Sequence, residues 1–277
     1  SRKLDDHLLG REYELSINVI SPFNDDAASP EAVRMRSMSR EELAVALQPD
    51  ERFIRDLMLF KKTDKFIRQA RAGTQQPGRD RIVAEKGDQN GRRYKDLELR
   101  LRKLMAESRM FVRGDELDIG GEEPQDRIVK GFQGLIDKVY VNLPMLRGVT
   151  YAEADILKAA TPENGLFGNN GEGLTEAEQD VLNYVQGQAR NGVKVSVKYL
   201  TERFGSKPYG WQTTAVLCLA ASLSGKGKLE ARSDGTVLER ADLARNLNNS
   251  HALANILLTP QTEFTSAQIR RDMPKSW

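Results

Sequence analysis

The sequence predicts a mainly helical α+β protein with small β elements, in which a helical region precedes a winged-helix-like domain. Apolar residues recur at helical spacing over most of the chain, and strand-like alternation is confined to short runs. Within residues 174–246 these patterns follow the order helix, strand, helix, helix, hairpin. This order is typical of winged-helix domains, which generally contact nucleic acid or another protein.

The first helix of this domain has a clear start. Thr175 is a good N-cap, and Glu178 follows three residues later, as in a capping box. Val181, Leu182 and Val185 then recur at helical spacing. The sequence therefore predicts a helix that begins directly after Thr175.

Two more helices follow. The second presents Leu200 and Phe204 on one face and ends at Gly205. The third is expected to begin near Pro208, because proline is favoured in the first turn, and to run to Leu223.

Short strands complete the domain. Residues 193–196 alternate apolar and polar side chains, and so do residues 228–232 and 236–239 on either side of Asp234-Gly235. An Asp-Gly pair between two alternating runs is a strong hairpin signal. We therefore expect a wing near the end of the domain.

The N-terminal half mixes strands and helices. Residues 13–19 alternate as a half-buried strand, residues 43–47 repeat the pattern, and Asp50 is the expected N-cap of a helix that lasts to about Ala72. Residues 92–110 form a second amphipathic helix.

A short hairpin and a third helix follow. The hairpin is expected at residues 111–119, and the helix is expected after Pro124, ending near Pro144. The glycine-rich stretch 165–173 is the best linker. These features divide the chain into a strand and helix segment (1–72), a basic helical region with a short hairpin (73–164), a linker (165–173), the winged-helix-like domain (174–246) and a C-terminal extension (247–277).

Charge is unevenly distributed. The 277 residues carry a formal net charge of only +2, but residues 61–113 hold 16 Lys or Arg against 7 Asp or Glu. Residues 115–126 hold six acids. This pattern fits either a phosphate-binding surface or solvated helix faces with i,i+4 ion pairs, and we favour the second.

The sequence shows no catalytic constellation. Cys218 is the single cysteine and lies in an apolar run, while the two histidines, His7 and His251, stand far from clustered acids. These residues cannot form a structural zinc site, so no metal ligands are assigned. The nearest approach to a phosphate loop, residues 222–228, follows a helix and lacks a hydroxyl after its lysine.

The chain has the character of a cytoplasmic fragment. A single cysteine fits a reducing compartment, and no apolar run reaches the roughly 18 residues of a membrane span. It starts at Ser1 without methionine. We therefore expect a piece of a longer, cytoplasmic polypeptide without membrane contacts.

Several stretches resemble the large P-loop, AAA-like ATPases of BREX phage-defence systems, of the BrxC/PglY type. They are residues 204–212 (FGSKPYGWQ) followed by an apolar helix, residues 227–232 (GKLEAR), and residues 47–54 (LQPDERFI) leading to residues 62–67 (KTDKFI). The resemblance spans about residues 16–240.

The resemblance implies a multidomain ATPase that acts with a methyltransferase and other partners in DNA modification and phage restriction. The nucleotide-binding loop of that family is absent from this sequence. No ATP-site residue is therefore transferred, and ATP and Mg²⁺ are expected only in the parent protein. The fragment itself is expected to be non-catalytic and to bind no cofactor. Its expected partners are other defence proteins. A homo-oligomer that forms through the parent protein remains an open alternative.

One hypothesis is non-specific contact with double-stranded DNA. Residues 190–232 carry eight Lys or Arg against two acids, and phosphate contacts of that number make affinity fall steeply with salt. A stand-alone winged-helix DNA-binding regulator is the alternative. The candidate nucleic-acid-binding residues are Lys194, Lys198, Arg203, Lys207, Gln212, Lys226, Lys228 and Arg232.

A second hypothesis is a protein-docking module. Residues 211–223 contain no charged residue, whereas a helix that reads bases needs polar side chains on its exposed face. So much apolar surface favours burial, either within the domain or against another domain.

Overall fold

The computed structural model describes residues 1–72, 77–161 and 173–261. The chain forms two compact units, Ser1–Val139 and Tyr140–Trp277. Most of the predicted linker, residues 165–173, lies outside the described residues. The predicted α+β class with a winged-helix-like domain is confirmed.

The first unit is built on a sheet with the strand order β2-β1-β3-β4-β5-β6. The inner strands β1, β3 and β4 run parallel to one another, and the remaining neighbours are antiparallel. Its strands are β1 (Arg2–Leu4), β2 (His7–Leu9), β3 (Ser16–Ile20), β4 (Glu42–Ala46), β5 (Arg109–Val112) and β6 (Asp115–Leu117). Since β4 pairs with β5, the predicted segments 1–72 and 73–164 share one sheet.

Helices cover the central strands on both faces. The helical segments are the 3₁₀ turn η1 (Asp25–Ala28), α1 (Pro30–Ser37), α2 (Glu51–Arg71), α3 (Pro77–Ala106) and α4 (Pro124–Val139). Val33 of α1 packs with Ile20 and Phe111. On α4, a Cβ at Gly131 would lie 2.9 Å from the sulfur of Met110, so this helix depends on glycine for its close approach to the sheet. All five residues of β4 are consequently buried.

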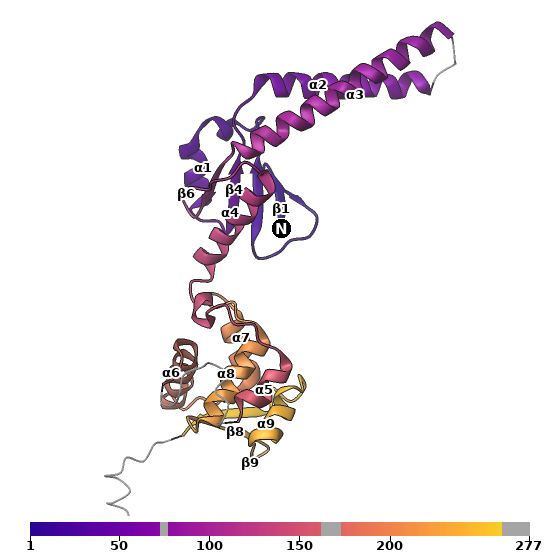
Figure 1. Cartoon of the computed structure of the whole chain (residues 1–277). Coiled ribbons are helices and arrows are strands. Elements are labelled where there is room, and N and C mark those ends of the chain that lie inside the picture. The colour runs from indigo at the N-terminus through magenta and orange to yellow at the C-terminus, as the bar shows by residue number, and fades with distance from the viewer. Residues whose placement is uncertain (73–76, 162–172, 262–277) are drawn as a thin grey trace, which may run out of the picture. The chain divides into compact units, whose positions relative to one another are not determined.

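Helices α2 and α3 lie side by side and extend away from the sheet (Figure 1). Asp50 caps α2 by accepting a hydrogen bond of 2.9 Å from the Phe53 amide, which confirms the predicted start. Helix α3 runs from Pro77 to Ala106 rather than over residues 92–110. Val83 packs against Ile67 and Ala70 of α2, and such packing supports the part of α3 that contains Gly87, a residue of low helix propensity.

The second unit contains the predicted winged-helix order. Its elements are η2 (Leu143–Leu146), α5 (Glu153–Ala159), α6 (Glu176–Arg190), β7 (Val195–Ser196), α7 (Val197–Gly205), α8 (Thr213–Gly225), β8 (Leu229–Ser233), β9 (Thr236–Val237), α9 (Arg240–Leu247) and β10 (Ile256–Pro260). Strand β10, in the predicted C-terminal extension, pairs with both β7 and β8. Residues beyond 246 are therefore integral to this sheet.

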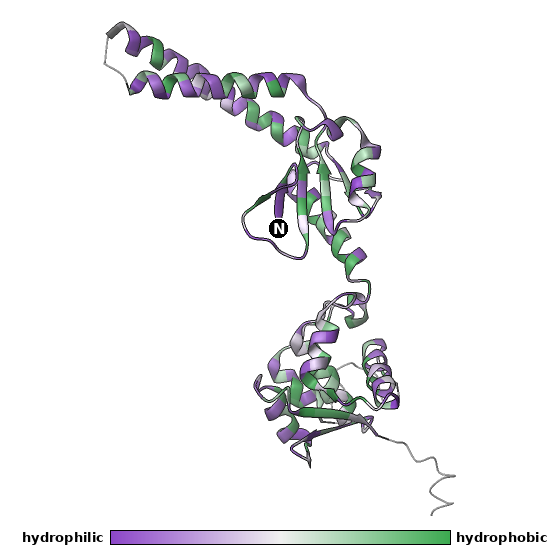
Figure 2. Cartoon of the chain, turned by 180° about the vertical axis from the view of Figure 1, so that it is seen from behind, coloured by the Kyte–Doolittle hydropathy of each residue, from purple (hydrophilic) through white to green (hydrophobic). Residues whose placement is uncertain are grey.

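The predicted start of the third helix near Pro208 is wrong, because α8 begins at Thr213. The preceding residues are held by an aromatic cluster instead. Trp211 stacks on Phe204 with ring centroids 4.9 Å apart, and its indole nitrogen donates to the Asn142 carbonyl over 3.0 Å. Figure 2 shows the hydrophobic residues concentrated in the central strands of the first unit and within the second unit.

Candidate nucleic-acid interface and docking groove

Helix α8 occupies the position of a DNA-reading helix, but it is enclosed. Every residue from Ala215 to Leu223 is buried, and the helix packs against α5, α6, α7 and α9. A helix covered on these sides has no face for a DNA major groove. Gln212 and Thr213, which precede the buried stretch, are exposed. The apolar composition of residues 211–223 is thus explained by burial within the domain itself.

Lys226 binds an internal carboxylate. Its ammonium lies 2.7 and 2.8 Å from the two carboxylate oxygens of Glu178, whose side chain is fully buried. Glu178 also accepts hydrogen bonds from the Ser222 hydroxyl (2.5 Å) and the Thr175 amide (2.8 Å), which completes the predicted capping box.

This carboxylate is stable as an anion. Burial alone would raise the pKa of Glu178, but the hydrogen bonds from Lys226, Ser222 and Thr175 outweigh burial and lower it. The charge of Lys226 is therefore neutralised inside the domain.

Other predicted phosphate ligands also have neighbours within the domain. The guanidinium of Arg203 lies 5.8 Å from the ring centre of Tyr184 and 5.3 Å from that of Tyr209. Arg232 pairs with Glu230. Glu230 offsets the charge of Arg232, whereas Arg203 keeps its charge but is held over the two rings.

The remaining candidates are distributed over several elements. Lys194 is exposed in the turn before β7, and Lys198 on α7 is 3.9 Å from Glu202 in an exposed pair of the kind that contributes little. Lys207 and Lys228 are half-buried, and neither is free of a partner. The eight predicted residues therefore do not form one open cationic surface.

Residues 222–228 do not fit a nucleotide. Phosphate loops present backbone N–H groups at the positive N-terminus of a helix. Here the segment lies at the C-terminus of α8, where carbonyl groups point outward, and its lysine is bound to Glu178. Residues 222–228 thus offer ATP no site of the phosphate-loop kind.

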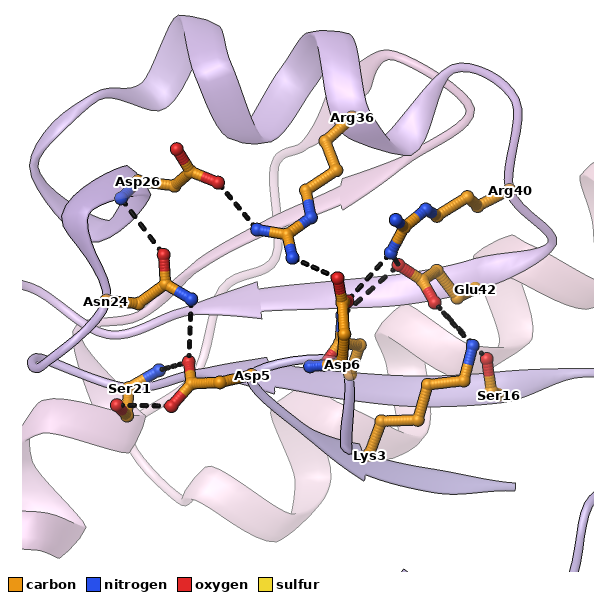
Figure 3. A network of polar contacts seen from close by, with 11 residues as sticks. Lys3, Asp5, Asp6, Ser16, Ser21, Asn24, Asp26, Arg36, Arg40 and Glu42 are labelled. Carbon is orange, nitrogen blue, oxygen red and sulfur yellow. Dashed lines mark hydrogen bonds and ion pairs between the residues drawn. The ribbon is translucent and has the colours of Figure 1, made fainter. Parts of the chain in front are cut away.

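A polar network lies beside β1, β3 and β4 (Figure 3). The two-residue turn Asp5-Asp6 joins β1 to β2, with both residues at positive φ. The carboxylate of Asp5 accepts hydrogen bonds from the Ser21 amide (2.8 Å), the Ser21 hydroxyl (2.6 Å) and the Asn24 side chain (3.1 Å). These bonds fix the turn to the segment after β3.

The inner part of the network is almost wholly buried. Glu42, with 2% of its side chain exposed, lies 3.0 Å from the Lys3 ammonium and 3.3 Å from the Arg40 guanidinium. Asn18 donates to both Glu42 (3.3 Å) and Asp6 (2.6 Å). Strands β1, β3 and β4 are therefore tied together by charged side chains as well as by their backbones.

Asp6 is the most perturbed acid of this network. Burial raises its pKa, but hydrogen bonds from Arg40, Arg36 and Asn18 outweigh burial and lower the pKa to about 2. An acid held so firmly as a carboxylate is a poor proton donor or acceptor near neutral pH. The network is suited to positioning the β1–β2 hairpin rather than to acid–base chemistry.

An apolar groove of about 770 Å³ lies in the first unit, lined by residues of β1 to β3, the loop that follows, α2, α3 and α4. Three of its large side chains are exposed to solvent: Leu4 by 42%, Leu9 by 50% and Phe23 by 48%. Large contiguous apolar patches on a protein surface usually mark sites that bind another molecule. We call this surface, defined by Leu4, Leu9, Phe23, Leu57 and Ile128, the docking groove.

Sequence reasoning missed the docking groove. Strands β1 and β2 are three residues each, too short for an alternation signal. A usable signal was the Asp5-Asp6 pair between two short runs, since acidic residues tolerate the positive φ of a two-residue hairpin turn.

Residues 1–72, 77–161 and 173–261 contain no cluster of His, Cys, Asp or Glu suited to a metal ion. Over the same ranges, no helix combines the length and the hydropathy needed to span a bilayer.

The fold defines a protein in which a mixed six-stranded sheet unit is joined to a winged-helix unit. Residues 1–135 match the family model described as the fourth domain of the BREX ATP-binding protein BrxC, with a six-stranded β sheet. Residues 140–261 match the model of the BrxC winged helix-turn-helix domain. The chain belongs to the BrxC family of BREX ATP-binding proteins. No solved structure matches it.

Proposed function

We propose that this chain is a non-catalytic part of a BREX ATPase and that it docks another component of the defence complex through the docking groove. The groove carries the proposal, because it leaves three large apolar side chains about half exposed on one surface. Burying such side chains contributes roughly 25 cal/mol per Å² of apolar area. ATP and Mg²⁺ are assigned to other domains of the parent protein.

The rim of the groove indicates the chemistry of its partner. Arg2 and Lys3 lie beside the apolar lining, and Lys3 is already paired with Glu42. A complementary segment therefore carries apolar side chains for Leu9 and Phe23 and an acidic residue near Arg2.

Non-specific DNA contact by the winged-helix unit is a second candidate. It rests on Lys194 and Gln212, which are exposed near β7 and α8. Two observations argue against a stand-alone DNA-binding regulator: the burial of α8 and the membership in an ATP-binding protein family.

Mass measurement by light scattering after size exclusion tests the docking proposal. The 277-residue chain is mixed with purified BREX proteins and with the rest of the parent ATPase. A complex is expected with one of them, and it is abolished in the variants Leu9→Glu and Phe23→Glu. The matched control is Met35→Glu, at a position on α1 that is 71% exposed and outside the groove. Equal complex formation by all three variants contradicts the proposal.

A further inference from the structure

The hairpin of α2 and α3 carries a surplus of positive charge along its length. Helix α2 holds seven Lys or Arg against three acids, and α3 holds nine against five. The 30 residues of α3 span about 45 Å at 1.5 Å per residue. The hairpin projects away from the sheet (Figure 1), and all its Lys and Arg residues are exposed except Arg93 and Arg100, which are half-buried.

One side of the hairpin contains a groove of about 780 Å³, which we call the cationic groove. Its charged lining comprises five cations and two acids, namely Arg52, Arg92, Arg93, Arg100, Lys103, Asp56 and Asp96. It shares no lining residue with the docking groove. Both helices contribute cations to it.

Two of the five cations are paired with acids at the start of α2. Arg100 binds the carboxylate of Asp50 through two nitrogens, at 2.5 and 2.8 Å, and Asp50 is the N-cap of α2. Arg52 lies 3.6 Å from Asp56. The Arg100–Asp50 pair joins α3 to the start of α2, so Arg100 is a poor phosphate ligand. Arg52 is paired within α2 with Asp56, an acid of the groove itself, so this pair adds no net charge to the groove.

The other three cations are open. Within the described residues Arg92 makes no ion pair, and Arg93 donates only to the side chain of Asn90, over 2.8 Å. Lys103 lies 3.8 Å from Glu107 in a pair exposed on both sides. Because exposed pairs of this kind contribute little, all three side chains are free to bind an anion.

We propose that the cationic groove binds the phosphate backbone of double-stranded DNA without reading base sequence. A duplex is a uniform polyanion with one charge per roughly 1.7 Å. The groove's cations on α3, from Arg92 to Lys103, extend over about 17 Å at 1.5 Å per residue. Cations also outnumber acids on each of the two helices, so a duplex can contact positive charge beyond the groove, whereas a short acidic segment of a protein uses the groove alone. Two helices side by side are about 20 Å wide, more than the roughly 12 Å of the major groove, so the hairpin lies along the backbone. This site is separate from the proposed docking function.

The test compares two triple variants of the 277-residue chain that remove equal charge. One is Arg92→Gln with Arg93→Gln and Lys103→Gln, in the cationic groove. Its control is Arg55→Gln with Lys62→Gln and Lys65→Gln, at exposed α2 positions outside that groove. Glutamine has nearly the helix propensity of Lys and Arg, so both hairpins are expected to fold, which far-UV circular dichroism checks.

Binding of a fluorescent duplex is measured by anisotropy between about 50 and 200 mM salt. The slope of log affinity against log salt is expected to fall by about 0.9 for each phosphate-binding cation removed, or about 2.7 in the groove variant. In the control variant the slope is expected to change by less than the equivalent of one such cation. Equal changes of slope in both variants, or no change in either, overturn the proposal.

Two further measurements use the unmodified chain. Acetylation with and without duplex is expected to show Lys103 protected and Lys62 and Lys65 unprotected; the reverse pattern overturns the proposal. Poly-glutamate at matched charge is expected to displace the duplex poorly. Displacement as efficient as that by unlabelled duplex assigns the groove to acidic proteins and overturns the assignment to DNA.

Discussion

Lys226 and Glu178 form an ion pair across the winged-helix unit, with the ammonium 2.7 and 2.8 Å from the two oxygens of a fully buried carboxylate. The pair joins the end of α8 to the first turn of α6. The sequence predicts Lys226 as a DNA contact, but in the structure its ammonium pairs with a buried carboxylate and stabilises the domain.

Replacing Lys226 by Gln is expected to destabilise the winged-helix unit. Removing one partner leaves the Glu178 carboxylate without its cation, which costs roughly 3–5 kcal/mol in buried pairs. Because 33% of the Lys226 side chain is exposed, we expect the lower end of that range. Denaturation followed by tryptophan fluorescence measures it, since Trp211 lies in this unit and residues 1–139 contain no tryptophan. Lys194→Gln, at an exposed site, is the control; if both variants unfold at the same denaturant concentration, the pair has no such role.

The reactivity of Cys218 reports on the packing of α8. Burial raises the pKa of this thiol to about 11, and the nearby charge of Asp155 adds to the effect. The thiolate is the reactive form, so iodoacetamide near pH 8 is expected to leave the folded chain unlabelled and to label it fully in denaturant. Since Cys218 is the single cysteine, mass spectrometry gives one unambiguous readout. Rapid labelling of the native protein argues against an enclosed α8.

The first unit is expected to lose stability in acid. The pKa of Asp6 is about 2 in the folded state against about 3.9 in an unfolded chain, so its contribution is complete above about pH 5. It falls as the pH drops from about 5 to 2, because over this range the unfolded state binds more protons. Asp6→Asn removes this part of the acid sensitivity. Thermal melts followed by circular dichroism at pH 5 and pH 3 measure this loss of stability. Because the first unit contains no tryptophan, its unfolding is the transition that tryptophan fluorescence does not report. If the Asp6→Asn variant keeps the same pH response, the assignment is refuted.

Gly225 is expected to tolerate no side chain. A Cβ there would lie 2.8 Å from the carbonyl oxygen of Ala160, at the end of α5, and backbone atoms cannot easily move aside. Gly225→Ala is therefore expected to lower the stability of the second unit. Gly187→Ala, inside α6 with open space around its Cβ, is expected to raise it by about 0.5–1 kcal/mol. Tryptophan fluorescence in denaturant compares them, and a gain in both variants contradicts the close packing of α5 on α8.

Local signals explain which elements the sequence predicts correctly. The Thr175–Glu178 capping box and the Asp234-Gly235 turn depend on residues close in sequence, and both are present in the structure. The burial of α8 follows from the lack of charge in residues 211–223. Strand β10 was not predicted, because its pairing with β7 and β8 connects residues far apart in sequence.

The candidate site was less predictable than the fold, because charge counts do not show which cations are paired. Lys226 and Glu178 are 48 residues apart, and only the packing of α8 on α6 brings them together. Arg203 is likewise drawn over Tyr184 and Tyr209 by the fold. The hairpin of α2 and α3 shows the opposite case, because three of its cations stay open.

Site-specific photo-crosslinking tests the docking proposal most directly. A benzophenone side chain is placed at Phe23 in the docking groove, or at Met35 outside it, in the full-length parent assembled with its BREX partners. Position 23 is expected to crosslink to one segment of another component, rich in apolar residues and with an acidic residue nearby, while position 35 gives no such product. Equal or absent crosslinking at both positions contradicts the proposal that this chain is a docking module.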